Sequence, residues 1–145
     1  MDDTELFDTE DFALSFSEEV SEKIQSVFSD SQTKEIKAYA ANVLIGHIPA
    51  KKVNESVDDV FELCGFHTKR FRFKDDHEGR FVTLFGFTAQ KAPCAYVTTS
   101  DRIYDALMKI VIVYGIPAAW KSGITVKIRM NALENGKAYS LEVLN

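Results

Sequence analysis

Hydrophobic side chains in the first third of the chain recur three or four positions apart, which is the spacing of one helix face. Within residues 15–45, Ser15 and Glu18 form a capping box that marks the start of a helix. A second helix ends before Gly46, where a C-terminal glycine cap is expected. The pattern predicts a helical hairpin over residues 15–46.

From residue 57 onward the hydrophobic period changes to two, which indicates strands. Gly65 marks a bend or bulge in the first strand. Between the third and fourth strands, Ser100 caps a helix that ends at Gly115. The predicted strands cover residues 57–74, 80–88, 94–99, 124–130 and 137–144.

This order of elements predicts the fold class and the domains. Three strands, a helix and two further strands are the order of a five-stranded OB-like β-barrel, so we expect an α+β fold preceded by the helical hairpin. An open α+β sandwich is the alternative. The expected organisation is an acidic flexible arm (1–14), the helical hairpin (15–46) and the barrel domain (57–145).

Alternation along the first strand separates aromatic from basic side chains. Phe71 and Phe73 share one face, and Arg70, Arg72 and Lys74 share the other. Because phenylalanine is usually buried, the basic set is expected to face water. A neighbouring Lys69 and the returning strand's Arg80 add to this basic surface.

The same reasoning assigns the other strands. Hydrophobic alternation in the fourth strand turns Lys127 and Arg129 outward. In the third strand, Val97 is expected in the core, which turns Tyr96 outward. The strand at 80–88 is apolar on both faces, so either it is buried on both sides or it exposes a row of aromatic rings.

Cations interleaved with aromatic rings are typical of a surface that binds single-stranded nucleic acid. The cations contact phosphates, and unpaired bases stack on the rings. Trp120 beside Lys121 adds a second candidate ring. Two alternatives remain open: the basic strand is a solvated edge that resists aggregation, and Trp120 folds back to close the barrel. The candidate binding residues are Lys69, Arg70, Arg72, Lys74, Arg80, Tyr96, Trp120, Lys121, Lys127 and Arg129.

Charge is divided unevenly along the chain. The 145 residues are 46% hydrophobic and carry a net charge of −5, as expected for one soluble domain. Residues 1–35 contain 11 acids and 2 bases, whereas residues 36–145 contain 15 bases and 11 acids. An acidic arm on a basic body indicates an interaction segment, or a segment kept for solubility.

Catalytic and cofactor chemistry finds little support in the sequence. Cys64 and Cys94 are too few for a disulfide scaffold, and the three histidines are scattered, so no metal or other cofactor is expected. No phosphate-binding glycine loop is present. The acidic N-terminus and the lack of an apolar run of about 20 residues predict a cytoplasmic protein without a membrane segment.

Four short runs resemble a family of small single-stranded DNA-binding replication proteins of phages and plasmids of Gram-positive bacteria. The runs are Ala95–Ser100, Tyr114–Trp120, Ile124–Lys127 and Asn135–Val143, and the resemblance covers about residues 80–145. It implies a non-enzymatic protein that binds single-stranded DNA in replication or recombination, in the host bacterial cytoplasm. The acidic arm and the run Phe66–Arg70 depart from the family pattern.

The partners follow from the resemblance and the charges. Single-stranded DNA is the expected ligand, another replication protein is a candidate partner for the acidic arm, and a homo-oligomer is compatible with the sequence. The alternative function is a protein-binding or inhibitory module whose acidic arm mimics nucleic acid. The charge of the binding surface distinguishes the two functions: DNA binding uses the basic body, whereas mimicry uses the acidic arm.

Overall fold

The order of elements in the described chain follows the predicted order closely. The structure, a computed structural model, describes residues 34–72 and 78–145. Its elements are α3 (Lys34–Ile45), β1 (Lys51–Lys52), the 3-10 helix η1 (Val53–Glu55), β2 (Val60–Arg72), β3 (Glu78–Phe87), β4 (Pro93–Thr98), α4 (Asp101–Tyr114), the 3-10 helix η2 (Pro117–Ala119), β5 (Ile124–Leu133) and β6 (Gly136–Val143).

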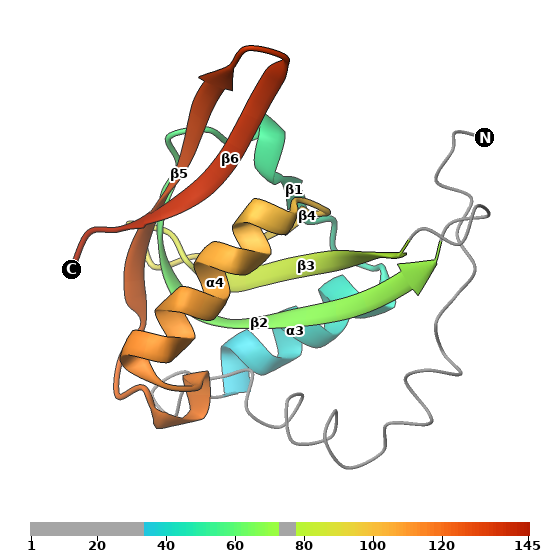
Figure 1. Cartoon of the computed structure of the whole chain (residues 1–145). Coiled ribbons are helices and arrows are strands. Elements are labelled where there is room, and N and C mark those ends of the chain that lie inside the picture. Colours follow the sequence, from blue (N-terminus) through green and yellow to red (C-terminus); the bar gives the residue numbers. More distant parts are fainter. Residues whose placement is uncertain (1–33, 73–77) are drawn as a thin grey trace.

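The strands form one mixed sheet that curls into a half-barrel (Figure 1). Their order is β1-β4-β3-β2-β5-β6, and every neighbouring pair is antiparallel except β1 with β4. The α+β class is confirmed, but the prediction of five strands is wrong. The additional strand, β1, has two residues, and so short a segment has no local hydrophobic pattern.

Helix α4 packs inside the curled sheet. It contacts β6 on one side and β3 on the other, and its buried residues Ile103, Leu107 and Ile110 meet the main core. Its ends match the sequence prediction. The Ser100 hydroxyl accepts a hydrogen bond from the Ile103 amide at 3.3 Å, and Gly115 ends the helix at a φ of 87°.

Helix α3 covers the opposite face of the sheet. Ile36 and Ala40 pack against Phe85 of β3 and Ala95 of β4 in a second, smaller core. Strand β3 is therefore buried on both faces. Of the two alternatives for its apolar pattern, burial on both sides is the correct one. The predicted helical hairpin over 15–46 is corrected: its described part is the single helix α3, and residues 15–33 and the arm at 1–14 lie outside the described residues.

A β-bulge in β2 determines which side chains face α4. The pairing with β3 shifts between Leu63 and Gly65, at the bend that the sequence predicts. Before the bulge, Phe61 and Leu63 lie in the main core, and after it Phe66 packs against that core. The inserted residue reverses the alternation, so even-numbered positions beyond the bulge face the α4 side.

Candidate nucleic-acid interface

The bulge places two of the predicted cations on the inner face of the sheet, beside α4. Arg70 of β2 lies directly opposite Arg80 of β3. The pair continues the row in which Thr68 opposes Val82, a residue of the main core. The predicted outward register of Arg70 is therefore wrong, because that prediction placed Phe71 and Phe73 on the core face, whereas the bulge turns the even-numbered positions toward α4.

A cation–π contact joins β3 to α4. The Arg80 guanidinium lies 4.2 Å from the centre of the Tyr104 ring. Both side chains are partly exposed, and such a contact is worth about 0.5–1 kcal/mol at an exposed site. Tyr104 is not among the site residues that the sequence predicts. Its position next to the buried helix stripe at Ile103 and Leu107 is the signal that marks it as a flanking residue.

Arg70 and Arg80 bring two positive charges to directly opposed positions, with Glu78 two positions before Arg80 in β3. Like charges that oppose each other across two strands destabilise the pairing, so an anion placed between or above them is favoured. Arg70 and Arg80 are each partly exposed; Arg80 contacts Tyr104, and Arg70 also has an interaction partner within the protein. The Arg70–Arg80–Tyr104 group is hereafter the arginine–tyrosine cluster.

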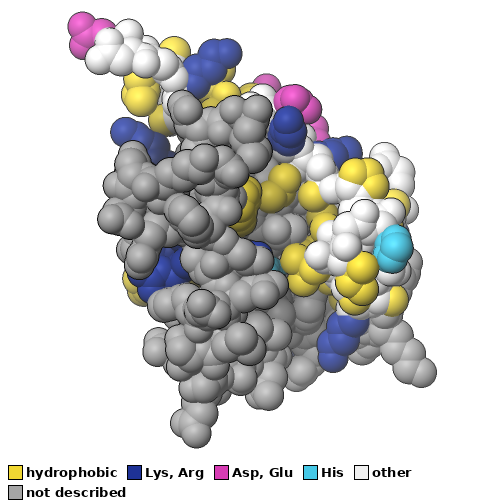
Figure 2. Space-filling view, turned by 90° about the vertical axis from the view of Figure 1, so that its right-hand side faces the viewer, with side chains coloured by type: hydrophobic (Ala, Val, Ile, Leu, Met, Phe, Trp, Pro, Cys, Tyr) yellow, Lys and Arg dark blue, Asp and Glu magenta, His cyan; other side chains and the backbone are white. Residues whose placement is uncertain are grey.

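The other predicted cations of this hairpin lie apart from the cluster or outside the description. Lys69 opposes Phe81, so it lies on the other face of the sheet. The backbone of Arg72 belongs to β2, but its side chain and the whole of Lys74 lie outside the described residues. Figure 2 views the molecule from the side at which β2 ends and β3 begins. It shows lysine and arginine side chains in several separate groups.

Tyr96 is buried, which corrects its predicted outward orientation. Its side chain is 2% exposed, because it opposes Leu84 on the core face of the sheet. The ring lies 4.5 Å from that of Phe61, and the hydroxyl donates a hydrogen bond of 3.0 Å to Asp59. Burial, with Cys94 and Asp59 adding to it, raises the pKa of Tyr96. Tyr96 is a core residue and offers no surface for base stacking.

Trp120 is also buried, so its predicted exposure is wrong and the alternative holds. The side chain is 4% exposed and belongs to the main core. Its indole nitrogen donates a hydrogen bond of 2.8 Å to the Gly115 carbonyl. This bond attaches the loop after α4 to the helix end. The adjacent Lys121 is exposed.

The two cations of β5 face outward as predicted, and each lies near an acid. Lys127 is 3.8 Å from Asp58, and Arg129 is 3.6 Å from Glu142. Exposed ion pairs of this kind contribute about 0–1 kcal/mol. They also lower the positive charge of this surface.

Burial changes the pKa of two cysteines and one histidine among the described residues. Burial, the largest cause in each case, raises the pKa of the Cys64 thiol to about 12 and that of Cys94 to about 11, which disfavours the nucleophilic thiolate. Burial, with Lys69 adding to it, lowers the pKa of His67. Among residues 34–72 and 78–145, no group of three or more metal-binding side chains is found. No helix in this described part is long and apolar enough to cross a membrane.

Comparison with known proteins gives no assignment. No protein-family model, no curated protein and no solved structure matches this chain.

Proposed function

We propose that the protein binds single-stranded DNA without catalysing a reaction, through the arginine–tyrosine cluster on the inner face of β2 and β3. The observation that carries the proposal is the Arg80 guanidinium stacked on Tyr104 with Arg70 directly across the strand pair. On the family resemblance, the protein acts in the replication or recombination of a phage or mobile element, in the host cytoplasm.

The chemistry of the cluster suits an unpaired strand. The guanidinium group of an arginine carries several N–H donors in a geometry that suits phosphate oxygens. A flat guanidinium also offers a face on which an unpaired base stacks. The Arg80 guanidinium already packs on the Tyr104 ring, 4.2 Å from the ring centre. The strand pair therefore supplies phosphate contacts and a stacking surface within one small area.

The charge of the body supports the same ligand. Residues 36–145 contain four more bases than acids. A moderate positive charge attracts a polyanion over a distance set by the salt concentration. The acidic residues 1–35 oppose this attraction, so the affinity of the full chain is expected to depend on both segments.

The test is a titration of labelled oligo-dT followed by fluorescence anisotropy. The double variant Arg70→Ala and Arg80→Ala is compared with Lys37→Ala and Lys91→Ala, which removes the same charge from two exposed positions that belong neither to the cluster nor to the predicted binding residues. We expect the cluster variant to bind at least ten times more weakly and the control to bind like the natural chain. Equal losses in both variants would leave only a diffuse charge effect and overturn the assigned site.

The alternative function predicts a different result in the same assay. An inhibitory module with a nucleic-acid-like arm would show no oligo-dT binding. It would instead compete with single-stranded DNA for a basic partner protein. Absence of oligo-dT binding at low salt would therefore overturn the proposed function in favour of mimicry.

A further inference from the structure

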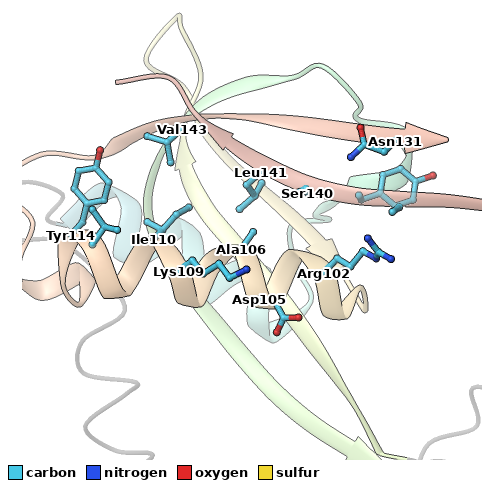
Figure 3. A pocket seen from close by; sticks show the side chains of 13 residues that line it. Arg102, Asp105, Ala106, Lys109, Ile110, Tyr114, Asn131, Ser140, Leu141 and Val143 are labelled. Atoms are coloured by element: carbon cyan, nitrogen blue, oxygen red, sulfur yellow. The ribbon is translucent and has the colours of Figure 1, made fainter. Parts of the chain in front are cut away.

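A groove of about 890 Å³ runs between α4 and the β5–β6 hairpin (Figure 3). It lies on the flank of α4 that is turned toward β6, whereas Tyr104 contacts Arg80 of β3 on the other side. Its volume is in the range of sites that hold small ligands or short peptide segments. The groove is thus a separate surface from the arginine–tyrosine cluster.

One wall of the groove is the open edge of a strand. β6 is the last strand in the sheet order, and its consecutive residues 138–141 all line the groove. Successive side chains of a strand point to opposite faces, so a wall made from consecutive residues is the strand edge. An edge strand presents backbone donors and acceptors that an extended segment can pair with.

The two ends of the groove differ in chemistry. Arg102 and Asn131 lie at one end in Figure 3, while Tyr114 and Val143 lie at the other. Lys109 adds a second cation to the wall that α4 forms. Asp105 is the acid among the lining residues of this wall, and its carboxylate points away from β6 in Figure 3. The groove therefore combines cations on its helix wall with an apolar end.

The apolar end continues into unusually exposed hydrophobic surface. Val113 is 76% exposed and lines the groove, and the preceding Ile112 is 80% exposed. Contiguous exposed apolar side chains commonly mark an interaction site. Among the described residues nothing buries these two side chains, so this end of the groove suits an apolar side chain from an incoming segment.

The chain itself contains a segment with the complementary chemistry. Residues 1–14 contain six acids together with Leu6, Phe7, Phe12 and Leu14. Residues 1–14 lie outside the described residues, so their match to the groove is inferred from their sequence alone. The stretch 15–33 that joins them to α3 spans at most about 65 Å when extended, which reaches any point on a domain of this size. The covalent link also raises the effective concentration of the segment.

We propose that residues 1–14 bind within the same molecule in the α4–β6 groove. Their aromatic side chains occupy the apolar end near Val113 and Tyr114, and their carboxylates lie beside Arg102 and Lys109. The proposal does not depend on DNA binding, and its test contains no DNA.

The test uses the full chain with the photoreactive residue p-benzoyl-phenylalanine in place of Phe7 or Phe12. After irradiation, digestion and mass spectrometry identify the cross-linked peptides in the monomer fraction. We expect cross-links to the peptides that contain residues 102–114 or 138–143. Cross-links that map elsewhere would overturn the proposal, as would their absence. Cross-links confined to the dimer fraction would assign the groove to a second copy and equally overturn binding within one molecule.

Charge reversal tests the ionic part of the contact. Arg102→Glu with Lys109→Glu should lower the cross-link yield at least threefold, whereas Lys91→Glu with Lys121→Glu, an equal charge change outside the groove, should leave the yield unchanged. Adding Asp8→Lys and Glu10→Lys to the groove variant should restore the yield. Circular dichroism verifies that each variant is folded. Equal yields in the groove and control variants, or no restoration, would overturn the proposed contact.

Discussion

Tyr96 and Trp120 show how strongly a single side chain depends on distant parts of the chain. Both have a polar atom that suits an exposed position, yet both are buried and satisfy that atom internally, on Asp59 and on the Gly115 carbonyl. The partner of Tyr96 lies 37 positions away in sequence. Local alternation cannot reveal such a partner, so Tyr96 was predicted at the surface and Trp120 was left open between the surface and the barrel interior.

Gly86 occupies a position where two strands leave no room for a side chain. It opposes Leu63 beside the bulge, and an added Cβ would collide with the Glu62 carbonyl oxygen. We expect Gly86→Ala to lower the free energy of unfolding by about 3 kcal/mol, at the upper end for overpacking. Urea unfolding measures the change.

Gly46→Ala is the control for this substitution. Its added Cβ meets open space, although its φ is 101°. The strain of a positive φ should cost about 1 kcal/mol, which is less than the collision at Gly86. Equal losses in the two variants would contradict the close approach of β2 and β3 at the bulge.

The buried thiols predict how stability changes at alkaline pH. Burial raises the pKa of Cys64 from 9.0 to about 12 and that of Cys94 to about 11. Between pH 9 and 11 the folded chain keeps protons that the unfolded chain releases, so the free energy of unfolding falls as the pH rises. Below pH 9 this contribution is fully present. Urea unfolding in reducing buffer at several pH values measures the fall.

The variant Cys64→Ala with Cys94→Ala isolates the contribution of the thiols. We expect its free energy of unfolding to fall less steeply over the same pH range, because two of the groups that release protons on unfolding are gone. Identical pH profiles for the variant and the natural chain would contradict the burial of the thiols.

At the scale of elements, local signals identified most helices and strands. The Ser100 cap and the glycine ends at 46 and 115 all lie where the sequence predicts them. The exact count of residues at the bulge was not available from the pattern. One inserted residue reverses every side chain that follows. The bend at Gly65 was predicted, but the face of Arg70 was predicted from the usual burial of Phe71 and Phe73, and that prediction is wrong.

The contact between β3 and α4 can be measured by a double-mutant cycle. Arg80→Ala and Tyr104→Leu, singly and together, should give a coupling of about 0.5–1 kcal/mol in the free energy of unfolding, because the cation–π contact exists only when both side chains are present. Arg102→Ala with Tyr104→Leu is the matched control, since residues two apart on a helix do not face each other. Additive changes in the Arg80 cycle would contradict the contact.

At the scale of the whole molecule, charge is the main organising feature. An acidic segment precedes a basic body, and the sequence alone established that division. The order of elements predicted a barrel-like sheet, but strand β1 and the α4–β6 groove could not be predicted, because they arise from pairing between distant segments and from the place where α4 packs. Neither has a local signature.

Neutralising the acidic segment should strengthen DNA binding. Replacing the six acids of residues 1–14 by asparagine or glutamine removes negative charge that repels phosphates. We expect oligo-dT to bind several times more tightly at low salt, with the difference shrinking as salt screens the charges. Anisotropy titration of both chains at two salt concentrations measures it. An equal or lower affinity for the neutralised chain would show that the acids do not oppose DNA binding.

The most direct test of the central claim is the salt dependence of oligo-dT binding. The logarithm of the association constant should fall linearly with the logarithm of the salt concentration, because bound phosphates release counterions. In the variant Arg70→Ala with Arg80→Ala, the slope should become shallower by about 1.4, at about 0.7 for each lost phosphate contact on a single strand. A slope that the variant leaves unchanged, or an affinity that does not vary with salt, would contradict a phosphate site at the arginine–tyrosine cluster.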